Sequence, residues 1–450
     1  MPETIVVDRL AARRFLVRRT GLGRTAGQPW PEPEPAPPAG NGKAAPPQDA
    51  VPDAARAATL RAVRAMEYVQ VDPVQVVGRN HDLVLAARVP GYRPEALDRL
   101  LYGERLLVEA IANERSIVPV EDYPLFRLRF ARYENTYRPR LADLEPVLEE
   151  VLAKLRADGP LSSLDFEDDR RLSGWWNLDG QADTRVVRQA LEWLWHFGRV
   201  VVTRRDAGRR VFDLAERVYG IGDKPPGAAL PKGARAPLTE DELRALREGL
   251  ARKYVRAAGL SAPGRSHFGW FKRPVAERRA VAASLVEAGE LVPVVVEGVK
   301  TPYFVPAAEA GDLVTAGAWD PAPVIRFLPP LDNLIWDRAR TLELFGFDYT
   351  WEVYTPPAKR KYGPYTCPIL RGDVLVGRIE ARLDRRKPAS GGQSEGEGDP
   401  EGGGRLVVRG VWWEGKPLAP KEFRRALEEW AAACGASDVD YDPGRVPMSR

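Results

Sequence analysis

Cysteine, histidine and long apolar runs are scarce in this sequence of 450 residues. Its two cysteines, Cys367 and Cys434, are too few for a disulfide scaffold or a cysteine-rich zinc site. No apolar run approaches the roughly 18 residues of a membrane-spanning helix, and the N-terminal MPETIVVDRL lacks the basic and apolar regions of a signal peptide. We therefore expect a reduced, cytoplasmic, globular protein with no membrane partner.

A large excess of one charge is also absent, because 67 Lys and Arg residues face 63 Asp and Glu residues and the formal net charge is +4. A balance this close bears on function only where basic residues gather in one place. At roughly 100–200 residues per domain, the length predicts about three domains, each with room for a core.

Two segments have the composition of irregular loops. Residues 21–54 hold nine of the 41 prolines, and residues 388–404 are rich in glycine. Such compositions favour extended or flexible chain over a packed element, so the first segment is expected to be disordered and the second flexible. Both interrupt patterned sequence, and we interpret them as insertions into domains.

A weak internal repeat carries the prediction of fold. Three times an amphipathic helix is expected to end at a glycine and to precede two short apolar strands around a polar turn, with the strands starting after Gly103, Gly198 and Gly289. Helices are also expected near residues 144–155, 184–197, 241–257, 274–288 and 420–433. Helices followed by a two-stranded wing form the winged-helix module, which commonly binds nucleic acid.

We therefore predict an α+β protein of three tandem winged-helix modules followed by a small β-rich C-terminal domain. The modules are expected at residues 1–120, 121–220 and 221–310, and the C-terminal domain at 311–450. A repeat of this kind also fits a transcription regulator that binds DNA without catalysis, or a scaffold for protein partners, because the fold alone does not settle function.

Basic residues gather at three places. The middle wing carries Arg199, Arg204, Arg205, Arg209 and Arg210; the segment 126–140 carries Arg127, Arg129, Arg132, Arg138 and Arg140; and an expected hairpin tip carries Lys359, Arg360, Lys361 and Tyr362. Any one of these clusters could be only a solvated face. All three together favour contact with DNA phosphates.

The candidate for chemistry is the segment Gln70-Val71-Asp72-Pro73. Pro73 disfavours the α conformation at Asp72, and in an extended backbone the side chains of Gln70 and Asp72 lie on one side. An amide and a carboxylate placed together can orient a water and accept its proton. Spacing alone favours a different interpretation, in which Asp72 and Gln75 form the capping box of the next helix.

These residues and four longer strings resemble the winged-helix DNA glycosylases of the AlkZ/YcaQ type, which repair bulky alkylation damage and interstrand crosslinks. The resemblance extends over nearly the whole chain and includes the Gln70-Val71-Asp72 triplet with an expected helix at 76–89. The strings are Ser173-Gly174-Trp175-Trp176, Gly198–Val202, Asp332-Asn333-Leu334-Ile335-Trp336-Asp337-Arg338 and Tyr354-Thr355-Pro356-Pro357-Ala358-Lys359-Arg360-Lys361-Tyr362-Gly363. The Gln-x-Asp form of the motif resembles the branch of broader specificity.

The resemblance implies hydrolysis of the N-glycosidic bond of N7-alkylated purines in double-stranded DNA, including crosslinks. Asp72 is then expected to act as base and anion, and Gln70 to position the water. No lysine lies beside the motif in sequence, so we expect a monofunctional hydrolase that needs no metal or other cofactor and works as a monomer. His81 could approach the lesion or a phosphate, and Trp175 and Trp176 could support the site, although burial in the core is as common a fate for such residues.

Overall fold

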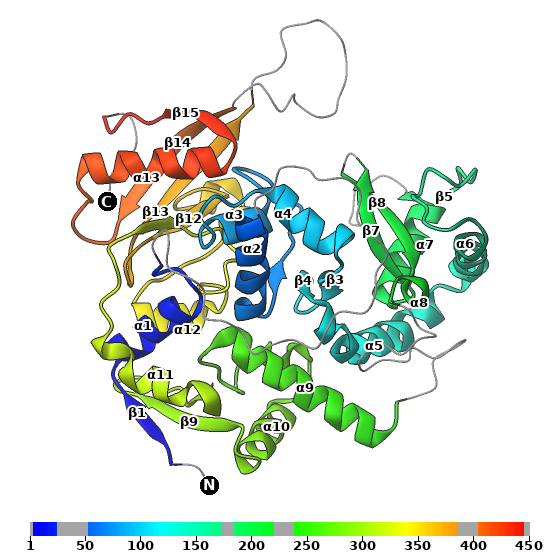
Figure 1. The fold of residues 1–450 in the computed structure, drawn as a ribbon, viewed down its shortest axis with the longest axis horizontal. Coiled ribbons are helices and arrows are strands. Elements are labelled where there is room, and N and C mark those ends of the chain that lie inside the picture. Colours follow the sequence, from blue (N-terminus) through cyan, green and yellow to red (C-terminus); the bar gives the residue numbers. More distant parts are fainter. Residues whose placement is uncertain are drawn as a thin grey trace, which may run out of the picture.

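The computed structural model describes residues 3–24, 53–172, 184–206, 208–219, 238–385 and 404–444. Helices and small sheets alternate along the first three quarters of the chain, and a larger sheet closes the C-terminal part (Figure 1). The segment Trp175–Trp176 and most of the two irregular segments lie outside the described residues. Within the described part of the chain, no helix combines the length and apolar character needed to cross a membrane.

All three predicted hairpins are confirmed. They consist of β3 (Leu107–Ile111) with β4 (Arg115–Pro119), β7 (Val200–Asp206) with β8 (Arg209–Leu214), and β9 (Leu291–Val296) with β10 (Tyr303–Pro306), each pair antiparallel. Gly198 and Gly289 precede their strands at φ angles of 63° and 74°, as a glycine that ends a helix should. Gly103 is not left-handed in this way. It ends a π-helix over Arg99–Gly103, and the residue with a positive φ angle is Arg105, at 56°.

The predicted helices are also present, with shifted ends. They are α6 (Glu145–Asp158), α7 (Val186–His196), α9 (Glu240–Ala258), α10 (Val275–Glu287) and α13 (Pro420–Ala433). The start of α9 shows why such limits can be predicted, because Thr239 and Glu242 form a reciprocal capping box there. The α+β class is confirmed, whereas the count of winged-helix modules and their limits stay predictions.

The N-terminal segment lies with the third hairpin, which the sequence did not indicate. β1 (Ile5–Val7) pairs in parallel with β9, and the following helix α1 (Arg9–Arg19) buries Phe15 and Leu16 in a core shared with Val294 and Tyr303. Many residues between 62 and 117 form a different core, and others, such as Tyr68 and Val77, belong to further cores. A first unit that spans residues 1–120 would therefore contain parts of several cores.

The first hairpin gains a third strand that places the candidate motif. α2 (Asp53–Met66) leads into β2 (Val69–Gln70), which pairs with β4 so that the strand order is β2-β4-β3. Met66 and Val69 are fully buried in the core with Ile117 of β4. Burial of these apolar side chains fixes the register and thereby the position of Gln70 at the end of the strand.

The C-terminal part is β-rich, as predicted. The strands β11 (Ile325–Phe327), β12 (Thr366–Arg371), β13 (Val374–Asp384), β14 (Gly404–Trp413) and β15 (Ala436–Asp440) form one sheet in chain order. α13 covers this sheet, with Trp430 stacked on Phe327 at a centroid distance of 4.5 Å. The sheet lies beside α3 (Asn80–Ala86), the helix that follows the candidate motif (Figure 1).

Candidate active site and nucleic-acid interface

Gln70 ends a short strand and is held through its backbone and its side chain. Its main-chain carbonyl accepts a hydrogen bond of 2.8 Å from the Asn80 side-chain amide, and its Oε1 accepts one of 3.2 Å from the indole Nε1 of Trp336. Gln70 is only 5% exposed. The strand then continues for one residue, because the Val71 N–H donates to the Arg115 carbonyl at 2.8 Å. The amide therefore has a defined place beside the turn of the first hairpin.

Asp72 follows in a tight turn and not at the start of a helix. Its Oδ1 accepts a 2.8 Å hydrogen bond from the Val74 N–H, two residues on. Burial raises the pKa of the half-buried Asp72 carboxyl above its usual value, and the Val74 bond offsets only part of that shift. A raised pKa is the direction expected of a carboxylate that serves as a base near neutral pH.

The predicted capping box is wrong. The helix expected at 76–89 begins only at Asn80, where Arg79 is the N-cap residue. The physical reason is the C-terminal sheet: Val74, Val76 and Val77 pack into its core, and the Val76 carbonyl accepts a 3.0 Å bond from the Leu383 N–H. These contacts keep residues 73–79 out of a helix, so the Asp72 carboxylate does not cap one.

Tyr365 belongs to the C-terminal core on which Val74 and Val77 pack. Burial raises the pKa of its hydroxyl far above the usual value, and the charges of Cys367, Tyr349 and Asp72 add to that shift. The hydroxyl is inaccessible and has no hydrogen-bond partner among the described residues. Asp72 therefore lies in the chain between a strand of the first sheet and the valines that pack on the C-terminal sheet.

His81 is buried in α3. Only 8% of it is exposed, and burial lowers the pKa of its imidazole to about 4, so the ring is neutral at pH 7. Its Nδ1 has no partner within the described part of the chain. A neutral, buried ring is poorly suited to phosphate, and this placement gives the predicted DNA contact no support.

The arginines of the middle wing divide into two kinds. Arg205 donates to Glu109 at 2.7 Å and to the Tyr102 hydroxyl at 2.9 Å, and Arg210 pairs with Glu192. These two guanidinium groups are used in contacts between the wing and its neighbours. Arg204 and Arg209 are exposed, although Arg204 also bonds Asp206 at 3.0 Å. The wing thus offers fewer free cations than its sequence predicts.

The basic run near residue 360 is a loop and not a hairpin tip. A 3-10 turn over Pro357–Lys359 leads into it, and β12 starts only at Thr366. The carboxylate of Glu352 accepts hydrogen bonds from the backbone N–H groups of Lys361, Tyr362 and Gly363, at 2.9 to 3.0 Å. Although burial raises the pKa of Glu352, these three donors and the Lys361 charge bring it below the usual value.

The side chains of this loop point to different surroundings. Lys359 and Lys361 are exposed, whereas the Tyr362 ring packs edge-on against Trp412 at 5.3 Å and lies 4.3 Å from the Arg378 guanidinium carbon. Arg360 donates to the Thr355 carbonyl at 2.8 Å. The loop therefore presents two lysines to solvent from an ordered backbone.

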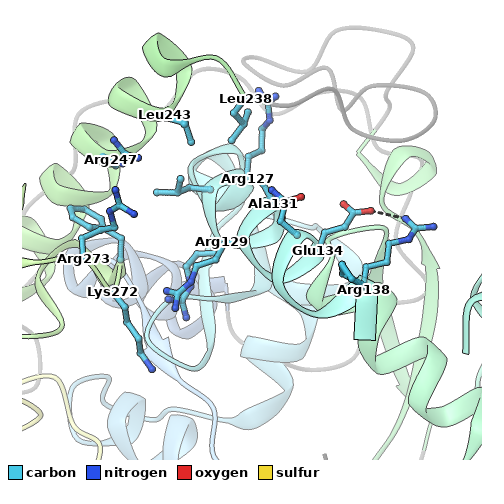
Figure 2. Close-up of a pocket in the computed structure, with 15 residues that line it drawn as sticks. Arg127, Arg129, Ala131, Glu134, Arg138, Leu238, Leu243, Arg247, Lys272 and Arg273 are labelled. Atoms are coloured by element: carbon cyan, nitrogen blue, oxygen red, sulfur yellow. Dashed lines mark hydrogen bonds and ion pairs between the residues drawn. The ribbon is translucent and has the colours of Figure 1, made fainter. Parts of the chain in front are cut away.

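A basic hollow of about 1170 Å³ opens between α5 (Arg127–Tyr137), α9 and the segment after Trp270 (Figure 2). One of its lining residues is acidic, Glu134, and seven are basic: Arg127, Arg129, Arg132, Arg138, Arg247, Lys272 and Arg273. We call it the basic groove. Figure 2 shows Arg247 and Arg273 facing Arg127 and Arg129 across it. The arginine-rich segment predicted from the sequence forms one wall. The other wall includes Arg247, Lys272 and Arg273, which were not predicted to bind DNA.

Arg129 connects the basic groove to the motif. Its guanidinium donates to the Trp270 carbonyl at 2.7 Å and to the Asn113 carbonyl at 3.2 Å. Asn113 belongs to the turn between β3 and β4, and Arg115 at the start of β4 binds Val71, next to Asp72. The basic groove and the Gln70–Asp72 motif therefore contact the same hairpin.

A buried lysine pairs with Glu67, just before the strand of the motif, and sequence spacing missed this contact. Lys253 of α9 is inaccessible to solvent and donates to Glu67 at 2.8 Å and to Asp122 at 2.6 Å. Both carboxylates accept hydrogen bonds from the ammonium group.

Among the described residues, no group of three or more His, Cys, Asp or Glu side chains has the arrangement of a metal site.

Two further residues of the site, Asn80 and Trp336, were not given roles from the sequence. Trp336 lies within the string from Asp332 to Arg338, whose composition indicates nothing of its contact with Gln70, 266 residues earlier. Only the tertiary structure brings these segments together. No local signal in the sequence could have paired them.

Known proteins that resemble this chain in sequence or fold include DNA glycosylases. A family model described as "DNA glycosylase AlkZ-like" matches residues 63–436. The fold is similar to that of the Streptomyces sahachiroi DNA glycosylase AlkZ, with a TM-score of 0.55 and 16% sequence identity over 99% of this chain and 100% of that chain. At this identity the likeness shows the fold, whereas the family match covers the motif, the basic groove and the basic loop.

Proposed function

Because the chain belongs to the AlkZ-like family of DNA glycosylases, we propose that it hydrolyses the N-glycosidic bond of N7-alkylated purines in duplex DNA and leaves an abasic site. Bulky adducts and interstrand crosslinks are included among its substrates. Asp72 acts as base and anion, Gln70 positions the water, and no cofactor takes part. The protein works as a cytoplasmic monomer.

The observation that carries this proposal is the environment of Asp72. One carboxylate oxygen is fixed by the Val74 N–H, and the other makes no hydrogen bond to a described residue. The carboxyl is half-buried, its pKa is raised by that burial, and the buried amide of Gln70 lies two residues away. A base that is fixed at one oxygen and available at the other is suited to accept a proton from water.

The chemistry needs little more than this pair. Alkylation at N7 places positive charge on the purine, so its departure requires no general acid. The bond between the sugar C1′ and N9 breaks with its electron pair on the purine, and positive charge develops on the sugar. Asp72 stabilises that charge and accepts a proton as the water oxygen bonds to C1′.

Lys253 supports hydrolysis over lyase chemistry. A lysine nucleophile must lose its proton before it attacks C1′. Lys253 is inaccessible to solvent and is held by Glu67 and Asp122. Its stabilising contacts would have to break before a Schiff base formed, so water is the better nucleophile here.

The basic groove and the basic loop are proposed to hold the DNA backbone. Arg132, Arg247 and Lys272 of the groove pair with no carboxylate within the described ranges, and Lys359 and Lys361 are exposed on the loop. Together they place cations on separate parts of the surface, as contact with an extended polyanion requires. Arg204 and Arg209 add exposed charge on the middle wing.

The decisive experiment measures base release from a duplex that carries one N7-alkylguanine, under single-turnover conditions. Asp72→Asn should slow release by about 100-fold or more, as loss of a general base does, and Gln70→Ala should also slow it, because the water loses its hydrogen-bond donor. Both variants should bind the duplex as tightly as wild type. A variant of an exposed acid, Asp312→Asn, should release the base at the wild-type rate. Failure of the folded wild-type protein to release base from either a monoadduct or a crosslink would contradict the proposal.

A further inference from the structure

We propose that Trp336 is a positioning residue, which fixes the amide of Gln70 so that its N–H group, and not its oxygen, faces the reacting water. The inference rests on the function proposed above. It assigns a role in the reaction to a residue that lies 266 positions from Gln70 in the chain and 3.2 Å from it in the structure.

The orientation follows from the chemistry of the two groups. An indole nitrogen is a donor only, so the atom of Gln70 that meets it must be the amide oxygen. Trp336 Nε1 donates to that oxygen. The amide nitrogen then points away from Trp336, and no described residue accepts a hydrogen bond from it. Gln70 therefore has two N–H donors that bond no described residue, whereas its oxygen already accepts the bond from Trp336.

Trp336 is itself held in place by aromatic neighbours. Its ring meets that of His267 edge-on at a centroid distance of 4.5 Å and that of Tyr68 at 6.5 Å. His267 Nε2 lies 3.4 Å from Asp337 Oδ2. Edge-on contacts of this kind favour one ring orientation and so one direction for the indole N–H. The direction of the donor is thus set before any substrate binds.

A second bond aligns the two segments. The side-chain amide of Asn333 donates to the Tyr68 carbonyl at 2.9 Å, so residues 333–336 follow residues 68–70 with a contact at each end. Rotation of the Trp336 ring away from Gln70 would leave the buried amide oxygen without a partner, which is unfavourable. The contact is therefore a stable feature of the site.

The proposed geometry gives each group one task. A water that accepts a hydrogen bond from the Gln70 N–H can turn its own hydrogen toward Asp72 and its remaining lone pair toward the sugar. If the amide were reversed, its oxygen would compete with Asp72 for the same hydrogen. Trp336 prevents that reversal, and it does so without contact with the water or the substrate.

The test uses Trp336→Phe in the full-length protein. The phenylalanine retains an aromatic ring but has no donor, so single-turnover base release should slow by about five- to tenfold, the effect of one ordinary hydrogen bond, while affinity for the duplex stays unchanged. Trp270→Phe is the matched control. It removes an indole from the same aromatic cluster, 5.0 Å from Tyr68, and its Nε1 has no partner among the described residues.

Two further variants separate positioning from simple packing. In a Gln70→Ala background, Trp336→Phe should cause no additional loss, because Trp336 acts only through the amide. Gln70→Glu keeps an oxygen for the Trp336 donor but has no N–H, so its rate should fall to that of Gln70→Ala. Circular dichroism and thermal unfolding would identify any variant that fails to fold.

The outcomes distinguish this inference from the function on which it rests. Three results would overturn the positioning role while glycosylase activity stands. Trp336→Phe could release the base at the wild-type rate, or it could lose no more rate than Trp270→Phe. Trp336→Phe could also lose the same fraction of rate in the Gln70→Ala background as in the wild-type background. Substantial activity in Gln70→Glu would overturn the assignment of the N–H as the working group. An inactive wild-type protein would overturn both proposals.

Discussion

Arg88 and Asp332 form a two-bond ion pair that solvent does not reach. The guanidinium donates to the two carboxylate oxygens at 2.6 and 2.8 Å, and both side chains have no exposed surface. Arg88 follows α3, whereas Asp332 begins the segment that carries Trp336. The pair therefore joins the two parts of the chain whose relative position determines the contact between Trp336 and Gln70.

Removal of one partner from this pair should be costly. Asp332→Asn leaves the Arg88 charge buried without compensation, and we expect the free energy of unfolding to fall by about 3–5 kcal/mol in urea titrations. Glu429→Gln is the control, because Glu429 pairs with Arg425 on the surface and exposed pairs contribute about 0–1 kcal/mol. Equal stability of the two variants would contradict the importance of the buried pair.

The pKa of Asp72 predicts the acidic limb of the activity profile. Burial raises this pKa, and the base must be ionised, so the rate should fall as pH decreases through a value above the ordinary aspartate pKa of about 3.9. Single-turnover rates between pH 4 and 8, corrected for spontaneous base loss, would show the limb. The residual rate of Asp72→Asn should lack it; a limb that persists unchanged would assign the titration to another group.

The same shift predicts that Asp72 does not stabilise the fold. A carboxyl whose folded-state pKa is raised costs folding free energy at pH values above that pKa, where it is charged. Asp72→Asn removes the charge and keeps an oxygen to accept the Val74 N–H. At pH 7 the free energy of unfolding should therefore stay equal or rise. A clear loss of stability would restore the interpretation of Asp72 as a structural residue.

His81 should make the fold sensitive to acid. Its pKa is about 4 in the folded protein because of burial, and about 6.5 in an unfolded chain, so only the unfolded state takes up this proton as pH falls through that window. The stability that a neutral His81 contributes is present at pH 7 and is lost toward pH 4. At pH 5 the loss is about 2 kcal/mol.

His81→Gln is the variant that isolates this effect. His196 also has a pKa lowered by burial, so wild-type acid sensitivity has more than one source. The variant should show a shallower decrease in unfolding free energy between pH 7 and 5, whatever its stability at pH 7. Parallel curves for wild type and variant would show that His81 titrates normally in the folded protein.

The sequence predicts the repeated elements of this fold better than their assembly. The three hairpins and α13 follow from local patterns of apolar residues and glycine, whose physical basis lies within a few positions of each residue. The parallel pairing of β1 with β9 depends on contacts between residues almost 300 positions apart, such as Ile5 with Val294. Local periodicity contains no information on such pairs.

The candidate site also depends partly on local sequence and partly on contacts between distant residues. Pro73 disfavours the α conformation at Asp72, and the sequence already singled out Gln70 and Asp72 as the candidate for chemistry. Whether Asp72 caps a helix is decided by Val76 and Val77, which pack on the C-terminal sheet, because the helix starts only at Asn80. That competition between a local capping signal and tertiary burial could be decided only in the structure. Burial prevailed here, as it commonly does over local propensity.

Glu352 should hold the basic loop in its observed conformation. Glu352→Gln weakens three charge-assisted backbone hydrogen bonds, and we expect faster tryptic cleavage after Lys359 and Lys361 together with weaker binding to duplex DNA. Glu422→Gln, which alters an ion pair with Arg371 on the surface of the C-terminal sheet, should change neither. Unchanged cleavage in Glu352→Gln would show that the loop is ordered by its other contacts.

The basic groove predicts a specific salt dependence. Each phosphate contact adds roughly 0.9 to the slope of log affinity against log salt concentration, so removal of one contact should lower that slope by about one. Lys272→Ala is the sharpest variant, because Lys272 is exposed, lines the groove and has no carboxylate partner in the part of the chain that the structure describes.

Lys416→Ala is the matched control for Lys272→Ala. It also removes an exposed lysine, from the turn after β14, and Lys416 does not line the groove. Titrations of undamaged duplex between about 50 and 200 mM salt should give a smaller slope for Lys272→Ala than for wild type and for Lys416→Ala. The undamaged duplex restricts the comparison to the phosphate contacts, because no lesion contributes to affinity. Equal slopes for Lys272→Ala and wild type would exclude this wall of the groove from the path of the DNA and leave the lysines of the basic loop as the main contacts.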